Sequence, residues 1–364
     1  MKQSTDVLDT PRVAGNDLSL AYVLDPRFPG GTSSAVAAEL KVVTRLAKVR
    51  VHALETKMFP TRRIAPQLNK VLRDLNLELE WDADEIAADL VILHNPSCLK
   101  FQESIGTRII ARHLIVVTHE NFLRPGGAPA FDVAKCLGQI ASASISLQRS
   151  LAPVSTCNRE TIERWYHEFG SVAHWELLED DWFNICSFEK NAPTTMPRDR
   201  RGRHSRAGAE KFPSRDVMAM CFPATAESNV ILGADSLLRA DDVPKHWDLY
   251  PFGGLTLESF FKQIDFFVYF TATTWRESFG RVIAEAIAAG KIVITDPETA
   301  STFMGAAIGA APEDVDRIIA GYIAEPERYC ADVASAQDKL DRFSADAFEA
   351  RFGVVACRVS GTKI

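Results

Sequence analysis

Two carboxylates, Glu277 and Glu285, stand eight positions apart on either side of a Ser-Phe-Gly turn. Small and apolar residues follow the turn and predict a helix, which places Ser278, Phe279 and Gly280 at the helix start. The first N–H groups of a helix have no partner and the helix dipole is positive there, so a helix start attracts phosphate. Carboxylates on both sides of a bound diphosphate can accept hydrogen bonds from sugar hydroxyls. The pattern therefore suits a nucleotide sugar, and the alternative is an amphipathic helix with two solvated Glu residues.

Further candidates lie where predicted strands of the first half end. Gly30 and Gly31 follow a strand over 18–24, and glycine there lets the backbone approach a ligand closely. His119 directly follows a strand, and in an open α/β sheet that position faces the ligand crevice. His94 occupies a similar strand end and is expected to line the cleft. An ordinary tight turn and satisfied strand-end histidines are the alternatives.

A basic segment over 190–215 supplies candidate phosphate ligands. It has a low apolar content, several prolines and many arginines, and it includes Arg203, Arg206 and Lys211. Arginine can hold a phosphate through two hydrogen bonds and lysine adds a point charge, which together can stabilise a leaving diphosphate without a metal ion. The sequence leaves open which of the two arginines reaches the phosphate, and a solvated basic loop is the alternative.

The elements that must position these residues alternate between strand and helix. Strands are predicted at 18–24, 90–93, 114–117, around 153–155, 230–233, 266–270 and 292–294. Helices are predicted from Ser33 or Ser34 to Lys48, over 256–263, 280–289 and 312–323, and around Phe348, Phe352 and Val355. Ser155, before a helix, is expected to be an N-cap. Continuous apolar strands between helices indicate parallel sheets covered on both faces, so we expect an α/β chain with two Rossmann-like domains.

Composition excludes several classes of function. The 364 residues carry a net charge of −7, which gives no global support for nucleic-acid binding. Seven cysteines are scattered singly without a C-x-x-C pair, so neither a zinc site nor a disulfide framework is expected. The polar start lacks the apolar core of a signal peptide, and no run reaches the roughly 18–20 apolar residues of a membrane span. These features predict a cytoplasmic protein.

Residues 41–73 form a local exception to the negative charge. They hold nine basic side chains and a single acid, Glu55. This stretch is a candidate surface for anionic lipid headgroups, which would place the protein at the inner face of the membrane, or a site for an acidic or lipid-diphosphate acceptor. A solvated surface is the alternative.

The motifs and their order resemble the retaining glycosyltransferases of the GT-B fold, especially family four with its E-x7-E signature. The matching residues run from about 20 to 305, with Glu-Ser-Phe-Gly at 277–280 and Glu-Ala-Ile-Ala-Ala-Gly at 285–290. The resemblance implies an acceptor-side domain over 1–188, a nucleotide-sugar domain over 189–340 and a cleft between them. It also implies that a last helix within 341–364 crosses back to the first domain.

The resemblance implies the roles of the site residues as well. Glu277 would hold the transferred sugar, His119 would contact the sugar and the reacting centre, and Glu285 would bind the ribose. The donor's diphosphate and base would be bound by Gly30, Gly31, Arg203, Arg206, Lys211, Phe252 and Gly253, together with the turn residues. The implied reaction is a retaining, metal-independent transfer from a nucleotide-diphosphate sugar to a glycan or lipid-linked acceptor in cell-surface polysaccharide assembly, with no further cofactor.

Three other functions remain open from the sequence: a UDP-sugar 2-epimerase of the same fold, a catalytically silent scaffold and an NAD-linked oxidoreductase. The last is disfavoured because the G-x-G-x-x-G fingerprint is absent. Asp82-Ala83-Asp84 matches the D-x-D metal motif of another glycosyltransferase fold. We reject that match because the acidic residues that follow, over 85–89, predict a helix start.

Overall fold

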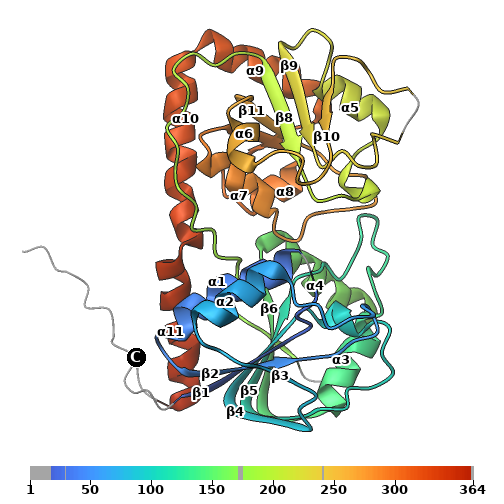
Figure 1. Cartoon of the computed structure of the whole chain (residues 1–364), viewed down its shortest axis with the longest axis vertical. Coiled ribbons are helices and arrows are strands. Elements are labelled where there is room, and N and C mark those ends of the chain that lie inside the picture. The colour runs from blue at the N-terminus through green and yellow to red at the C-terminus, as the bar shows by residue number, and fades with distance from the viewer. Residues whose placement is uncertain (1–17, 29, 171–174, 240–241, 362–364) are drawn as a thin grey trace, which may run out of the picture.

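The computed structural model describes residues 18–28, 30–170, 175–239 and 242–361, which form two α/β domains stacked end to end (Figure 1). Each domain is built on a parallel sheet, and the sheet orders are β3-β2-β1-β4-β5-β6-β7 and β10-β9-β8-β11-β12-β13. The Rossmann-like α/β architecture expected from the apolar strands is therefore confirmed.

The N-terminal sheet has its topological switch between β1 and β4, where the strand order reverses. Its strands are β1 Ser19–Leu24, β2 Lys48–Ala53, β3 Leu79–Trp81, β4 Glu85–His94, β5 Arg108–Thr118, β6 Ser144–Pro153 and β7 Glu176–Leu177. Its helices are α1 Gly31–Val43, α2 Pro66–Asp74, η1 Pro96–Leu99, α3 Val133–Ser142 and α4 Thr156–Phe169. Val91, Ile92 and Leu93 of β4 are fully buried, as expected for a strand covered on both faces. The loops after β1, β4 and β5 open on the crevice at the carboxyl edge.

The C-terminal sheet repeats this plan, with its switch between β8 and β11. Its strands are β8 Arg200–His204, β9 Ser228–Leu232, β10 Asp248–Tyr250, β11 Phe266–Tyr269, β12 Ile292–Thr295 and β13 Ile308–Gly309. The helical segments are η2 Ala209–Lys211, α5 Arg215–Cys221, α6 Leu257–Phe261, α7 Arg281–Ala288, α8 Pro297–Ser301, η3 Pro312–Asp314, α9 Val315–Ala324, α10 Pro326–Lys339, η4 Leu340–Phe343 and α11 Ala345–Ser360. The loops after β8 and β11 therefore meet at one edge.

The end of the chain joins the two domains. In Figure 1, α10 lies beside the C-terminal domain and α11 continues alongside the N-terminal domain. The α11 helix packs against α1, where Arg45 and Glu349 form an ion pair at 3.0 Å. Phe348 of α11 meets Trp182 edge to face, with ring centroids 5.3 Å apart. An apolar core that includes Phe279 and Phe343 continues from one domain into the other, so the start of α7 is packed against the junction.

Two local predictions are wrong. Residues 85–89 do not start a helix but begin β4, where Ile86 is buried and pairs with Ile109 of β5. Sheet pairing overrides the local preference of acidic residues for a helix start. The helix predicted from Ser33 or Ser34 to Lys48 also ends earlier, because α1 stops at Val43 and Lys48 begins β2. In addition, the basic run Arg200–His204, for which no strand was predicted, forms a central strand.

The basic residues fit inside that strand because their guanidinium groups are paired, both with neighbouring residues and with residues from distant parts of the chain. Arg201 is 2% exposed and binds Asp199 at 2.6 Å and Asp316 at 2.7 Å. A buried charge is tolerated only when it is paired and hydrogen-bonded. Among the residues that the structure describes, no helix is long and apolar enough to cross a membrane.

Candidate active site

Glu277 lies in the loop after β11 and is held by two donors. Lys211 Nζ and the Tyr269 hydroxyl both lie 2.6 Å from its Oε1. The Lys211 ammonium also sits over the Trp275 ring, 4.9 Å from the centroid. Burial opposes ionisation of Glu277, but the charge and hydrogen bond of Lys211 and the hydrogen bond of Tyr269 prevail and lower its pKa. Glu277 is therefore an ionised carboxylate in a sparsely solvated position.

The start of α7 lies immediately after this carboxylate. Gly280 is the N-cap residue with a φ of 86°, a left-handed conformation that favours glycine, and no side chain caps the helix. Ser278 turns its carbonyl toward α4 and accepts a hydrogen bond from Ser155 Oγ. The Phe279 ring is buried against Phe343, so Phe279 can offer a ligand only its backbone.

Glu285 faces the end of β8 from the second turn of α7. Its carboxylate lies 3.2 Å from Arg281 Nε and 3.4 Å from Nε2 of His204. Burial raises the pKa of Glu285 while Arg281 opposes the rise, and burial lowers the pKa of His204 to about 3. His204 is thus a neutral neighbour of Glu285 that the sequence reasoning missed, because the strand that ends at His204 was itself not predicted.

The structure separates the three basic candidates. Arg203 is fully buried, and its guanidinium donates to the carbonyls of Phe270, at 2.9 Å, and Lys211. It ties two loops together and does not face the cleft. Arg206 is half exposed and pairs with Glu210 at 2.7 Å. Its charge contributes to the lowered pKa of Glu277, although less than that of Lys211, which contacts the carboxylate directly.

His119 and the glycine loop lie at the carboxyl edge of the N-terminal sheet, where a ligand crevice is expected in this kind of fold. Gly30 is the N-cap residue of α1, and no atom lies within 4 Å of an added Cβ at Gly30 or Gly31. The preceding loop is held by a buried pair, in which Arg27 Nη2 lies 2.8 Å from Asp25 Oδ2. His119 is partly buried, and its Nε2 lies 2.9 Å from Nδ1 of His94.

His94 does not line the cleft as the sequence suggested. It is fully buried and stacks between His119 and Tyr22, with ring centroids 5.2 and 5.3 Å away. His94 is the last residue of β4 and still lies within the buried sheet. It therefore contacts His119 from the side of the protein core.

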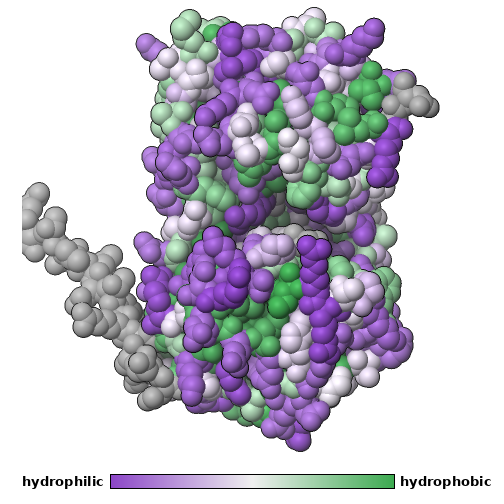
Figure 2. Space-filling model, in the orientation of Figure 1, coloured by the Kyte–Doolittle hydropathy of each residue, from purple (hydrophilic) through white to green (hydrophobic). Residues whose placement is uncertain are grey.

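Direct contacts fasten the two domains beside Glu277. Asn121 Nδ2 donates to the Arg276 carbonyl at 3.3 Å, and the Arg124 guanidinium lies 5.0 Å from the centroid of Trp275. Ser155 is the predicted N-cap of α4, accepting from Asn158 N–H, and it also donates to Ser278 as described above. A shallow hollow lies between these segments. The space-filling view shows a recessed waist where the domains meet (Figure 2).

Phe252 and Gly253 lie in the turn after β10, farther along the same edge. The Phe252 side chain is 65% exposed, and its N–H donates to Asp235 Oδ2 at 2.8 Å. Gly253 has a φ of 77°, which the turn requires. An exposed aromatic ring at this edge is free to stack on a planar group.

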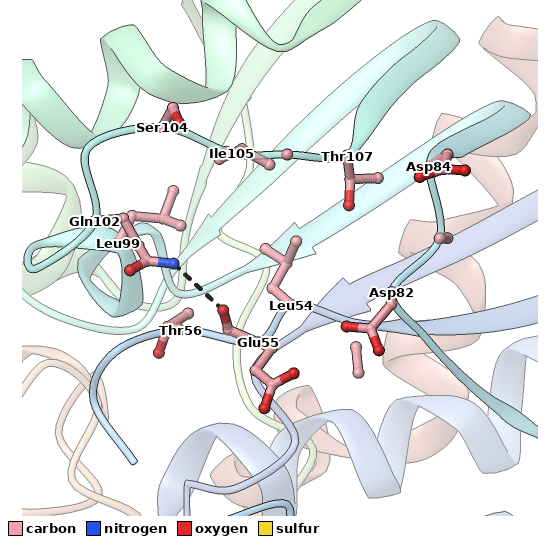
Figure 3. Close-up of a pocket in the computed structure, with 13 residues that line it drawn as sticks. Leu54, Glu55, Thr56, Asp82, Asp84, Leu99, Gln102, Ser104, Ile105 and Thr107 are labelled. Atoms are coloured by element: carbon pink, nitrogen blue, oxygen red, sulfur yellow. Dashed lines mark hydrogen bonds between the residues drawn. The ribbon is translucent and has the colours of Figure 1, made fainter. Parts of the chain in front are cut away.

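A separate hollow of about 300 Å³ lies on the N-terminal domain and contains none of the predicted site residues (Figure 3). Glu55, Asp82, Asp84 and Gln102 give it a polar lining, and Gln102 Nε2 donates to the Glu55 carbonyl at 3.3 Å. Sequence reasoning did not predict this hollow, because the residues that line it are far apart in the sequence and the Asp82-Ala83-Asp84 motif among them was rejected as a metal site.

Comparisons with known proteins address the fold. No protein-family model and no curated protein matches the chain. Among solved structures, HepE of Anabaena in complex with UDP and glucose has a TM-score of 0.61 at 13% identity, covering 94% of this chain and 100% of that one.

Two other structures are similar over most of their length. A glycosyltransferase of Rickettsia africae has a TM-score of 0.58 at 11% identity, covering 96% and 100% of the two chains. An α-glucosyltransferase in complex with UDP-glucose and DNA containing an abasic site has a TM-score of 0.54 at 12% identity, covering 93% and 99%. At these identities the likeness shows the fold alone, and it confirms the GT-B architecture expected from the sequence.

Proposed function

We propose that this protein is a glycosyltransferase that moves a sugar from a nucleotide-diphosphate sugar to a hydroxyl of a glycan or lipid-linked acceptor. One observation carries the proposal. An ionised carboxylate, Glu277, is held by Lys211 and Tyr269 directly before an uncapped helix start, beside the cleft between two Rossmann-like domains. Structural neighbours with the same fold were solved with UDP and glucose and with UDP-glucose, which supports a nucleotide-sugar donor.

In the proposed complex the diphosphate lies between the Gly30–Gly31 backbone, Arg206, Lys211 and the first N–H groups of α7. The helix start and the two cations stabilise the charge that develops on the leaving diphosphate, a role that otherwise falls to a metal ion. Arg206 is the proposed arginine ligand, because it is half exposed whereas Arg203 is buried and occupied by carbonyl groups.

The sugar and ribose hydroxyls are assigned to the two carboxylates. Glu277 accepts hydrogen bonds from the transferred sugar through the oxygen that Lys211 and Tyr269 leave open, and its fixed position orients the sugar ring. Glu285 accepts from the ribose, and Phe252 stacks on the base. The exposed ring of Phe252 supports the last assignment.

The proposed reaction retains configuration. The bond between the anomeric carbon and the phosphate oxygen breaks, and the acceptor oxygen bonds to the same face of that carbon while its proton passes to the leaving phosphate. His119 donates a hydrogen bond to the sugar at this centre. Closure of the domains excludes water and limits hydrolysis of the donor.

The basic stretch 41–73 supports a location near an anionic surface. All nine of its Lys and Arg residues are exposed, distributed over α1, the turn after α1, β2, the loop between β2 and α2, and α2. We infer that this face approaches anionic headgroups, which would bring a lipid-linked acceptor to the cleft in an assembly of cell-surface polysaccharide.

Two experiments test the proposal. A thermal-shift assay measures the binding of a panel of candidate donors, which consists of UDP, GDP, TDP and their sugars. Product analysis with and without a glycan acceptor then follows the fate of the donor sugar. The expected result is a clear shift with one nucleotide class and sugar transfer that requires the acceptor. Conversion of the donor sugar without an acceptor would indicate an epimerase. Absence of any nucleotide binding would indicate a silent scaffold and contradict the proposal.

A further inference from the structure

Four polar side chains form a line that runs from the cleft into the core of the N-terminal domain. His119 Nε2 lies 2.9 Å from His94 Nδ1, and His94 Nε2 lies 3.5 Å from Glu39 Oε2. The Tyr22 hydroxyl donates to that same Glu39 oxygen at 2.9 Å. Tyr22, Glu39 and His94 are fully buried, whereas His119 is only partly buried. The line therefore connects a candidate site residue to a carboxyl group in the middle of α1.

The two histidines constrain each other. Ring nitrogens 2.9 Å apart need one N–H and one lone pair between them. Both rings are neutral, because burial lowers the pKa of His119 to about 3 and also lowers that of His94 well below its usual range. A neutral imidazole carries a single N–H, so the tautomer of one ring fixes that of the other. The line thus has two states, in which the N–H groups point either toward the cleft or toward Glu39.

Glu39 stands where it can select between these states. Among the residues that the structure describes, His94 Nε2 has no hydrogen-bond partner, and the Glu39 carboxyl lies 3.5 Å from it. A buried polar atom without a partner is unfavourable, so a small approach that forms a hydrogen bond between His94 Nε2 and the Glu39 carboxyl is favoured. The groups that face Glu39 are Tyr22 from β1, His94 from β4 and Trp182 from the segment between the domains.

The environment of Glu39 favours its protonated form. Burial raises the pKa of Glu39 to about 8, against opposing interactions with Trp182 and Tyr22. Near neutral pH the carboxyl group therefore carries a proton, and the acceptor that faces it is the lone pair of His94 Nε2. A protonated carboxyl donates its hydrogen bond there.

We propose that Glu39 and His94 are positioning residues that fix the tautomer of His119, so that its Nδ1 presents an N–H group to the cleft. The Glu39 hydroxyl donates to His94 Nε2, His94 Nδ1–H donates to His119 Nε2, and His119 keeps its single proton on Nδ1. Removal of the proton from Glu39 reverses all these hydrogen bonds and leaves His119 Nδ1 as an acceptor. Which ring nitrogen of His119 carries the N–H group is thus determined by the protonation state of Glu39, which acts through His94.

For catalysis, the inference rests on the proposed function. An N–H on His119 can donate to a sugar oxygen in the cleft, whereas a bare nitrogen would face that oxygen with its lone pair. The tautomer itself is a property of the free protein, so it can be measured whether or not the protein transfers sugar.

The experiment is a long-range ¹H–¹⁵N correlation spectrum of the full chain labelled with ¹⁵N-histidine, with His119 assigned through a His119→Gln variant. At pH 6.5 we expect His119 to be protonated on Nδ1, and between pH 7 and 9.5 we expect it to change to the Nε2–H form. In Glu39→Gln the amide N–H₂ placed at the Oε2 position can donate both to His94 Nε2 and to the Tyr22 hydroxyl oxygen, so the Nδ1–H form should persist at every pH. In Glu39→Met the side chain can neither donate to nor accept from His94, so both tautomers of His119 should appear.

An Nε2–H tautomer in the wild type at pH 6.5 would overturn the proposal, as would identical spectra of wild type and Glu39→Gln across the pH range. If Glu39→Met does not fold, the comparison of wild type with Glu39→Gln still decides the matter. A protein that shows the expected tautomers but does not transfer sugar would contradict the proposed function and leave this inference standing.

Discussion

Replacement of Lys211 by methionine should destabilise the protein through the carboxylate that it leaves behind. The Lys211 and Glu277 side chains are 8% and 14% exposed, and their charged atoms are 2.6 Å apart. Removing one partner of a buried ion pair costs about 3–5 kcal/mol. The Tyr269 hydroxyl still donates to the same oxygen of Glu277. Because that bond persists, we expect a loss in the free energy of unfolding at the lower end, about 3 kcal/mol at pH 7.

The pH dependence of this loss has a definite sign. In the wild type the pKa of Glu277 is lowered, because Lys211 and Tyr269 outweigh the effect of burial. Such a group contributes stability above its unfolded pKa and loses it as pH falls through the folded value. Without Lys211 the burial effect dominates and raises the pKa, so the variant gains stability as the carboxyl takes up a proton. The gap between wild type and Lys211→Met should therefore shrink from pH 7 to pH 4.

Urea unfolding followed by circular dichroism, at several pH values, measures the gap. Glu277→Gln and the double variant complete a mutant cycle, and the double variant should be less destabilised than the sum of the single changes. A Lys211→Met protein within about 1 kcal/mol of wild type at pH 7, the range of a surface ion pair, would refute the reasoning. A gap that widens toward pH 4 would do the same.

Three further predictions concern nucleotide binding, the two arginines Arg203 and Arg206, and the basic surface. Glu285→Ala should raise the Kd of the preferred nucleoside diphosphate by about tenfold, since a hydrogen bond to a charged group contributes about 1.5–3 kcal/mol, and calorimetry that finds unchanged binding would remove Glu285 from the site. Arg206→Ala should weaken binding of the diphosphate but not of the free nucleoside, whereas Arg203→Ala should lower the unfolding midpoint because its carbonyl partners lose their donor. Charge reversal at Lys70 and Arg73 should reduce co-sedimentation with vesicles that contain anionic lipid, and equal co-sedimentation of variant and wild type would exclude α2 from a membrane surface.

The sequence predicted the fold because its signals were local. Apolar runs such as 90–93 and 114–117 lie in β4 and β5, and the turn at 277–280 does precede α7. The strand β8 was missed because its arginines look like a solvated loop. Two of their acidic partners, Asp265 and Asp316, lie 65 and 115 residues away from Arg200 and Arg201 and leave no trace in the local pattern.

The site was predictable to a similar extent. The sequence indicated the Glu277 and Lys211 positions, but not that the two side chains pair with each other, because the pairing requires the loops after β8 and β11 to meet. The support of His119 by His94 and Glu39 was also missed. A usable signal existed, since Glu39 falls on the same helical face as the buried residues Val36 and Val43, and an acid on an apolar face usually has a specific partner.

The central claim is that Glu277 holds the transferred sugar while other residues hold the nucleotide. The most direct test compares Glu277→Gln with the wild type in two measurements. These are the turnover of the nucleotide sugar that binds in the thermal-shift assay and the Kd of its nucleoside diphosphate. Glu258→Gln, on the exposed surface of α6, is the matched control. We predict a loss of turnover of about 100-fold or more, as for removal of one group that stabilises a transition state, with nucleotide affinity unchanged. Near-normal turnover in Glu277→Gln would contradict the account.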